Sequence, residues 1–208
     1  MATKSNFLNS IFLIVALSIP LSLGTSNINY THYDSQEDHV DQQPKRPKIT
    51  KSISQYQKNL LALAKKLNIV NDLPPGTMQG IIWQESKAGG HFKDVDKVET
   101  QRHAIFFGAA QVSLVAAQDV LNRWPQLREQ FNISSKYDIK EQLILNDVFN
   151  LTIAGKYLTL MKSYGFSTLN ELALAYNRGP EGAKRYDPET HPYATSVANH
   201  AEFLKQID

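Results

Sequence analysis

The sequence predicts an all-α (mainly helical) domain, preceded by an N-terminal targeting segment and a polar linker. From residue 52 onward, apolar residues recur at the i, i+3, i+4 and i+7 spacing of amphipathic helices. No stretch alternates polar and apolar residues for long enough to predict a sheet. Hydrophobic residues make up 42% of the 208 residues, which is enough to form the core of one ordinary domain.

The first 24 residues have the features of an export signal. Lys4 provides a positive charge, and residues 7–23 are largely apolar. Ser22 and Gly24 are small residues at the −3 and −1 positions of a cleavage site. We therefore expect residues 1–24 to be a cleaved signal peptide. The alternative is an uncleaved anchor, in which residues 7–23 cross the inner membrane at a tilt.

Residues 25–51 are polar and contain few apolar side chains. The charged residues of this segment are Asp34, Glu37, Asp38 and Asp41, followed by Lys45, Arg46, Lys48 and Lys51. Such a segment cannot bury enough apolar area to offset the entropy lost on ordering. We expect a disordered linker.

Six helices are predicted within the domain, which spans residues 52–208. Helical apolar periodicity runs through the domain, and four of the helices also begin with a capping signal. Residues 87–107 keep no lasting period and include two adjacent glycines, so we expect a loop there. The helices are expected at residues 53–67, 77–88, 113–124, 138–163, 168–176 and 192–204.

Capping signals set the expected helix boundaries. The candidate starts are Thr77 after a Pro-Pro-Gly turn, Ser113, Asp138 with Glu141, and Thr168 with Glu171. Gly165 is expected to end the fourth helix, because glycine readily adopts the left-handed conformation at a helix end. The sequence Asn-Arg-Gly-Pro at residues 177–180 is expected to break the fifth.

The composition excludes several classes of protein. Lys and Arg number 22 against 20 Asp and Glu, a formal net charge of +2 that does not favour a nucleic-acid partner. Cysteine is absent, so no disulfide or thiolate metal site can form. The six histidines form no i, i+4 pair, and no glycine-rich phosphate loop occurs. We therefore expect neither a metal nor an organic cofactor.

Glu85 occupies a position on the apolar stripe of the second helix where another core residue would be expected. With Met78, Ile81 and Ile82 it has the spacing i, i+3, i+4, i+7. Loss of water around its charged form would raise its pKa and keep a proton available near neutrality, as a general acid requires. The alternative is a carboxylate at the edge of the helix that reaches solvent or pairs with a base.

Four short segments occur in a defined order along the domain. They are Trp83-Gln84-Glu85-Ser86, Phe107-Gly108-Ala109-Ala110-Gln111, Ala175-Tyr176-Asn177-Arg178-Gly179, and Pro192-Tyr193-Ala194 followed by Val197. Together they resemble the catalytic domain of soluble lytic transglycosylases, the lysozyme-like helical enzymes that cleave peptidoglycan. Residues 150–158 also resemble the long central helix of that family. The resemblance covers about residues 53–208.

The resemblance implies that Glu85 is a single catalytic acid and base. It would protonate the glycosidic oxygen, and the C6 hydroxyl of the muramic ring would attack C1 to give a 1,6-anhydro product. Ordinary glycosidases use a second carboxylate, which the substrate's N-acetyl group would replace here. Ala109 and Ala110 depart from the family, which usually has two large residues there, and this implies a shallower groove wall.

The resemblance also implies substrate-binding residues, and each has a plainer structural alternative. Ser86 would bond near the anomeric centre or orient Glu85, or would be an exposed helix serine. Gln111 would bond a sugar amide or hydroxyl, or would only start a helix. Tyr176 would stack on a sugar or only pack, and Asn177 would bind sugar or only cap a helix. Tyr193 would hold Glu85 by its hydroxyl, or would be a core tyrosine.

Peptidoglycan glycan strands are therefore the expected partner of an exported monomer in the periplasm or cell envelope. A goose-type lysozyme-like hydrolase is an alternative enzyme, in which Asp94 or Asp96 would hold the attacking water. A glycan-binding factor is the alternative from another class. Its linker would dock the domain onto envelope-spanning secretion or conjugation machinery.

Overall fold

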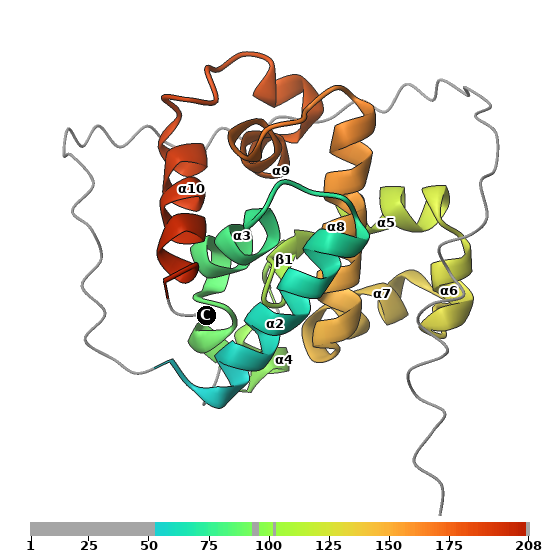
Figure 1. Ribbon diagram of the computed structural model, residues 1–208. Coiled ribbons are helices and arrows are strands. Elements are labelled where there is room, and N and C mark those ends of the chain that lie inside the picture. The colour runs from blue at the N-terminus through green and yellow to red at the C-terminus, as the bar shows by residue number, and fades with distance from the viewer. Residues whose placement is uncertain (1–52, 93–95, 102, 207–208) are drawn as a thin grey trace, which may run out of the picture. The chain divides into compact units, whose positions relative to one another are not determined.

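The computed structural model of the protein describes residues 53–92, 96–101 and 103–206 (Figure 1). This part is mainly helical, as predicted. Its elements are α2 (Gln55–Val70), α3 (Thr77–Ser86), the 3-10 turn η1 (Gly90–Phe92), α4 (Lys97–Thr100), β1 (Phe106–Phe107), β2 (Val112–Ser113), α5 (Leu114–Arg123), α6 (Gln126–Gln130), α7 (Lys136–Leu145), α8 (Asp147–Ser163), α9 (Leu169–Ala183) and α10 (Pro192–Leu204). The expected signal segment 1–24 and linker 25–51 lie outside the described residues.

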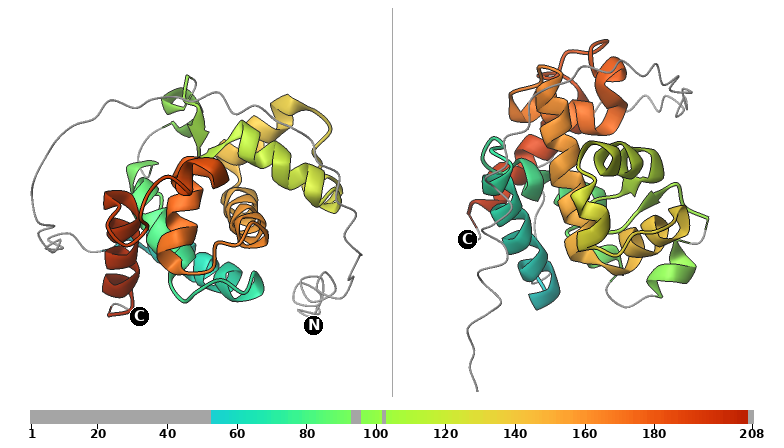
Figure 2. Two further views of the ribbon diagram at one scale, coloured as in Figure 1. Left: turned by 90° about the horizontal axis from the view of Figure 1, so that it is seen from above. Right: turned by 90° about the vertical axis from the view of Figure 1, so that its right-hand side faces the viewer.

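Helix α8 is the central element of the domain. It contacts α2, α5, α7 and α9, and Figure 2 shows these helices arranged around it when the molecule is seen from above. Its side chains are buried on most of its circumference, as expected for a helix covered on all sides. None of the described helices has the length and apolar character needed to span a membrane.

Several predicted boundaries are confirmed. The hydroxyl of Ser113 caps α5 by accepting a hydrogen bond from the Ala116 amide at 3.1 Å. Thr168 and Glu171 form a capping box at the start of α9. The expected break at residues 177–180 occurs at Gly179, which has a non-helical backbone with φ of 69°. The last helix begins and ends at the expected residues, 192 and 204.

The predicted single helix over residues 138–163 is wrong. The chain forms two helices there, and Asn146 is both the C-cap of α7 and the N-cap of α8. Its side chain accepts a hydrogen bond from the Phe149 amide at 3.0 Å, so it satisfies an otherwise unpaired amide at the start of α8. The capping box of α7 consists of Ser135 and Asp138, not Asp138 and Glu141.

Two further expectations need correction. Gly76, with φ of 85°, is the N-cap of α3, whereas Thr77 is the first helical residue and its hydroxyl donates to the Pro74 carbonyl at 2.8 Å. The expected loop at residues 87–107 contains the short elements η1 and α4. Asp96 caps α4 by accepting two backbone hydrogen bonds, which explains a helical turn in a stretch without apolar periodicity.

Helices α3 and α10 pack against each other very closely, and Figure 1 shows them side by side. Small residues form part of their contact: a Cβ added to Gly80 would lie 2.5 Å from the Val197 carbonyl oxygen, and one added to Gly76 would lie 2.9 Å from Ala201 Cβ. Glycine is therefore required at both positions for this approach. The pairing brings the last turn of α3 next to the first turn of α10.

Candidate active site

Glu85 lies in the last turn of α3 and is half-buried. The other members of its stripe, Met78, Ile81 and Ile82, are at most 1% exposed, so the stripe faces the core as predicted. Tyr193, from the first turn of α10, donates a hydrogen bond from its hydroxyl to Oε1 of Glu85. Burial raises the pKa of Glu85 above its ordinary value, and the bond from Tyr193 opposes that rise in part.

Tyr176 lies close to the same carboxyl group. Its hydroxyl donates to the Ala110 carbonyl oxygen at 2.7 Å, and its ring packs edge-on against Tyr157 with 5.8 Å between ring centres. Burial, followed by the negative charge of Glu85, raises the pKa of Tyr176 well above its ordinary value. The same two causes raise the pKa of Tyr193. Both phenols therefore remain protonated donors at neutral pH.

The short turn between β1 and β2 forms one side of this site. The strands pair antiparallel, with Phe107 opposite Val112, and Gly108 and Gln111 turn the chain with φ of 70° and 48°. Gln111 is half-buried and donates from its side-chain amide to the Gly108 carbonyl at 2.8 Å. The amide that was expected to contact sugar thus bonds within its own turn.

Ser86 stabilises this turn through a hydrogen bond to its backbone. It is fully buried, so the interpretation as an exposed helix serine is wrong. Its hydroxyl donates to the Ala109 carbonyl oxygen at 2.6 Å and accepts from the Gly89 amide at 2.7 Å. Ser86 thereby fixes the turn that presents Gln111.

Asn177 is exposed on α9, one residue from Tyr176 and two residues before the backbone break at Gly179. The structure therefore brings Glu85, Tyr176 and Tyr193 together, with the Gln111 turn tied to them through Ala110. Asn177 is adjacent in sequence and open to solvent. The side chains of Ala109 and Ala110 are buried.

Asn150 is a supporting residue that we did not predict as part of the site. It is fully buried in α8, accepts from the Ala110 amide at 2.8 Å, and donates to the carbonyl oxygens of Phe107 and Leu143 at 2.8 and 3.2 Å. A single asparagine among the mainly apolar residues at the start of the central helix is the signal that could have identified it, because a buried amide needs nearby partners.

Gln101 is a second supporting residue that sequence reasoning missed. It is 3% exposed and accepts from the Gly108 amide at 2.7 Å through its side-chain oxygen. Gln101 directly follows α4. Lys97, the first residue of α4, donates hydrogen bonds from its ammonium group to the Tyr56 hydroxyl at 3.0 Å and to the Asp147 carboxylate at 3.2 Å. Residues 96–101 are therefore anchored at both ends.

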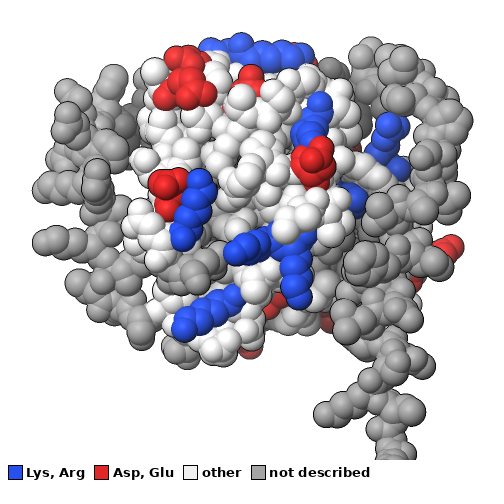
Figure 3. Space-filling view, in the orientation of Figure 1, with Lys and Arg blue, Asp and Glu red and all other residues white. Residues whose placement is uncertain are grey.

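Two acids were considered as the water-holding carboxylate of a hydrolase. Of these, Asp96 is exposed and its carboxylate caps α4, while Asp94 lies outside the described residues. Within the described ranges, no three His, Cys, Asp or Glu side chains form a group that could hold a metal ion. Figure 3 shows one face of the molecule, on which charged side chains of both signs are scattered over a largely neutral surface and in places adjoin each other.

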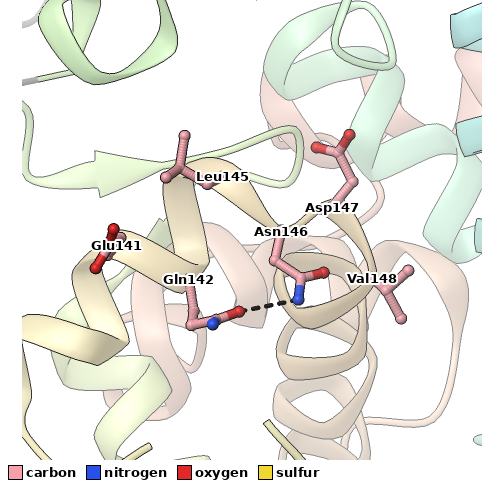
Figure 4. Close-up of a pocket in the computed structure, with 6 residues that line it drawn as sticks. All are labelled: Glu141, Gln142, Leu145, Asn146, Asp147 and Val148. Carbon is pink, nitrogen blue, oxygen red and sulfur yellow. Dashed lines mark hydrogen bonds between the residues drawn. The ribbon is translucent and has the colours of Figure 1, made fainter. Parts of the chain in front are cut away.

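An open pocket of about 370 Å³ lies elsewhere, where α7 meets α8. Figure 4 shows its lining, in which the Asn146 amide donates to Gln142 at 2.9 Å. Its lining residues are Glu141, Gln142, Leu145, Asn146, Asp147 and Val148. None of the residues around Glu85 lines this pocket.

Comparisons of the chain with protein-family models, with curated proteins and with solved structures found no match. The geometry of the site and the four ordered segments therefore carry the functional argument.

Proposed function

We propose that the protein is an exported lytic transglycosylase with a lysozyme-like catalytic domain, which cleaves the MurNAc–GlcNAc β-1,4 bond of peptidoglycan. The observation that carries this proposal is the environment of Glu85. A half-buried carboxyl group whose pKa is raised by burial, and which is oriented by the Tyr193 hydroxyl, has the properties of a general acid near neutral pH.

In the proposed reaction, Glu85 gives its proton to the glycosidic oxygen as the bond from that oxygen to C1 of the muramic ring breaks. The oxygen of the substrate's own N-acetyl group stabilises C1. The C6 hydroxyl then attacks C1, and the Glu85 carboxylate takes the proton that this hydroxyl loses. Proton and charge therefore balance without a water molecule, and the product carries a 1,6-anhydro ring.

The surrounding residues have supporting roles in this mechanism. Tyr193 stabilises the carboxylate formed after proton transfer, because its hydroxyl already donates to Oε1. Gln111 and Asn177 would contact acetamido and hydroxyl groups of the glycan, and Tyr176 would form the floor beside Glu85. Ser86 would act through the backbone of the turn that it holds.

A single carboxyl group suits this reaction better than hydrolysis by two acids. Burial raises the pKa of Glu85 and the bond from Tyr193 opposes that rise, while no neighbouring carboxylate among the described residues contributes to the shift. A retaining or inverting hydrolase needs a second carboxylate within about 5–10 Å of the first. The apolar segment at residues 7–23 supports export to the compartment in which peptidoglycan lies.

The direct test is digestion of purified peptidoglycan sacculi, with the muropeptides weighed by mass spectrometry. Products lighter by one water than hydrolysis products support the proposal. Reducing ends would instead indicate the goose-type hydrolase, and then Asp94→Asn and Asp96→Asn should be tested together. Glu85→Gln should abolish product, whereas the exposed Glu129→Gln should not. A chain that binds glycan without cleaving it would indicate the glycan-binding factor.

A further inference from the structure

A polar cluster lies between α3 and α10, beginning at the residue before the candidate acid. The side-chain oxygen of Gln84 accepts a hydrogen bond from the Ser196 hydroxyl at 2.7 Å. The same oxygen lies 3.0 Å from Nε2 of His200. His200 is only 9% exposed, and the other two residues are half-buried. One amide oxygen thus joins two positions on α10.

The direction of the bond from His200 follows from the chemistry of its partner. An amide oxygen can only accept, so Nε2 of His200 must carry the proton and donate it to Gln84. Nδ1 is buried, and none of the described residues gives it a hydrogen-bond partner. A second proton on Nδ1 would be unpaired and would also face the positive charge of Lys87. The neutral ring is therefore the form that makes this contact.

The remainder of the α3–α10 contact is mainly apolar. It includes Gly76 and Gly80 against Val197 and Ala201, which allow close approach, and the aromatic pair of Trp83 and Phe203, whose ring centres lie 6.4 Å apart. The Gln84 cluster adds directional bonds to these contacts. Directional bonds specify one relative position of two helices in a way that small apolar contacts do not.

The spacing links this cluster to the candidate acid. Tyr193, Ser196 and His200 have the spacing i, i+3, i+7 and lie on one stripe of α10, whereas Gln84 and Glu85 are consecutive on α3. Sliding α10 by one residue moves it by about 1.5 Å. A displacement of that size takes a hydrogen bond out of its working range. A slide of α10 against α3 would therefore break the Gln84 contacts and the Tyr193 contact together.

We infer that Gln84, Ser196 and His200 are positioning residues, which fix α10 against α3 and thereby hold the Tyr193 hydroxyl on Glu85. This inference deepens the proposed function and rests on it only for its effect on turnover. The link between the two contacts is a property of the folded domain and can be measured without any substrate.

The test is an NMR titration of the full-length chain with ¹³C at the tyrosine Cζ and glutamate Cδ positions. Glu85→Gln and Tyr193→Phe assign the two signals. In the wild type, the Tyr193 Cζ signal should shift as Glu85 ionises, because the phenol donates to that carboxylate. In His200→Leu this shift should become much smaller. His200→Gln, which keeps an N–H donor at similar reach, should restore it.

Asn199→Leu is the matched control, because Asn199 is the exposed neighbour of His200 on α10. It should leave the Tyr193 shift as in the wild type. If His200→Leu does not fold, Ser196→Ala and Gln84→Met replace it, since each removes part of the cluster without opening a large cavity. An undiminished Tyr193 shift in a folded His200→Leu, or in both replacement variants, overturns the inference.

The activity readout separates this inference from the proposed function. If the domain cleaves peptidoglycan, His200→Leu should lower kcat about 10- to 100-fold with little change in KM, because the acid is misplaced while the glycan surface remains. A fall in kcat/KM of the same size that came from a higher KM alone would contradict a positioning role. If the wild type has no activity and the Tyr193 shift is nevertheless lost in His200→Leu, the proposed function is wrong and the positioning role of the cluster stands.

Discussion

The hydroxyl of Tyr193 and the carboxylate of Glu85 form a hydrogen bond between residues 108 positions apart in the sequence. The bond joins the first turn of α10 to the last turn of α3. It is the contact that distinguishes Glu85 from a carboxylate at the edge of a helix, because it orients a half-buried group that burial has already made a weaker acid.

Replacing Tyr193 by Phe should therefore change both the pKa of Glu85 and the rate. The hydroxyl favours the carboxylate, so its loss should raise the pKa of Glu85 further. We expect kcat for release of anhydro-muropeptides to fall about 10- to 100-fold, as for a lost hydrogen bond to a charged group. The pH profile of kcat/KM should show the limb of Glu85 moved to higher pH. An unmoved limb would mean that another group limits the profile.

Glu85→Gln should separate activity from stability. Removing a general acid typically costs a factor of about 10² to 10⁴ in rate. The pKa of Glu85 is raised in the folded state, so the wild type loses folding free energy as pH rises through that pKa. Glutamine carries no charge and can still accept the bond from Tyr193. Its Tm at neutral pH should equal or exceed that of the wild type, whereas a clearly lower Tm would argue against a destabilising carboxylate.

Asn150→Asp should destabilise the domain although it hardly changes side-chain volume. A carboxylate cannot donate to the carbonyl oxygens of Phe107 and Leu143, and it would be buried. We expect a loss of about 3 kcal/mol in the free energy of unfolding, measured by urea denaturation. The exposed Asn122→Asp serves as the control and should change that free energy by no more than about 0.5 kcal/mol.

The stability of the domain should decline on mild acidification. Burial, together with the charge of Lys87, lowers the pKa of His200 to about 4, from 6.5. The unfolded chain therefore binds a proton that the folded chain excludes, and stability is lost as pH falls from about 6.5 to about 4. The loss is on the order of 1–3 kcal/mol. His200→Gln should flatten this part of the stability profile, measured by thermal unfolding at each pH. A profile as steep as that of the wild type would assign the decline to other groups.

The pH range over which His200 changes the stability differs from the range over which the capping carboxylates change it. Hydrogen bonds from Ser134 and Ser135 lower the pKa of Asp138 to about 2, and bonds from Thr168 and Ser167 lower the pKa of Glu171. Their contributions are present at neutral pH and are lost only as each carboxylate is protonated in more acidic solution. The two causes can therefore be separated in one titration.

Local signals in the sequence were sufficient to predict much of the fold. The helix at residues 192–204, the capping box of Thr168 and the break at Gly179 each depend on residues close together in the chain. The apolar stripe likewise placed Glu85 on the buried side of α3. The bond from Tyr193 agrees with the role that the family resemblance implied for it.

The remaining features depend on contacts between distant residues. The break at Asn146 interrupts a stretch in which the apolar residues continue, so periodicity favoured one helix over two. The turn that presents Gln111 is held by Ser86, Gln101 and Asn150, which lie on three different segments. No local pattern encodes such a turn, because the partners of its backbone are chosen by tertiary packing.

The support of one carboxyl group is divided among α3, α8, α9 and α10, which together extend from residue 77 to residue 204. A proteolytic fragment that lacks any of these helices would leave the acid without its orientation or its turn. An incompletely synthesised or unfolded chain would be inert toward glycans. If the domain cleaves peptidoglycan, catalytic competence should therefore appear in a single step with completion of the native domain, and the cell would be protected from this activity during synthesis and transport.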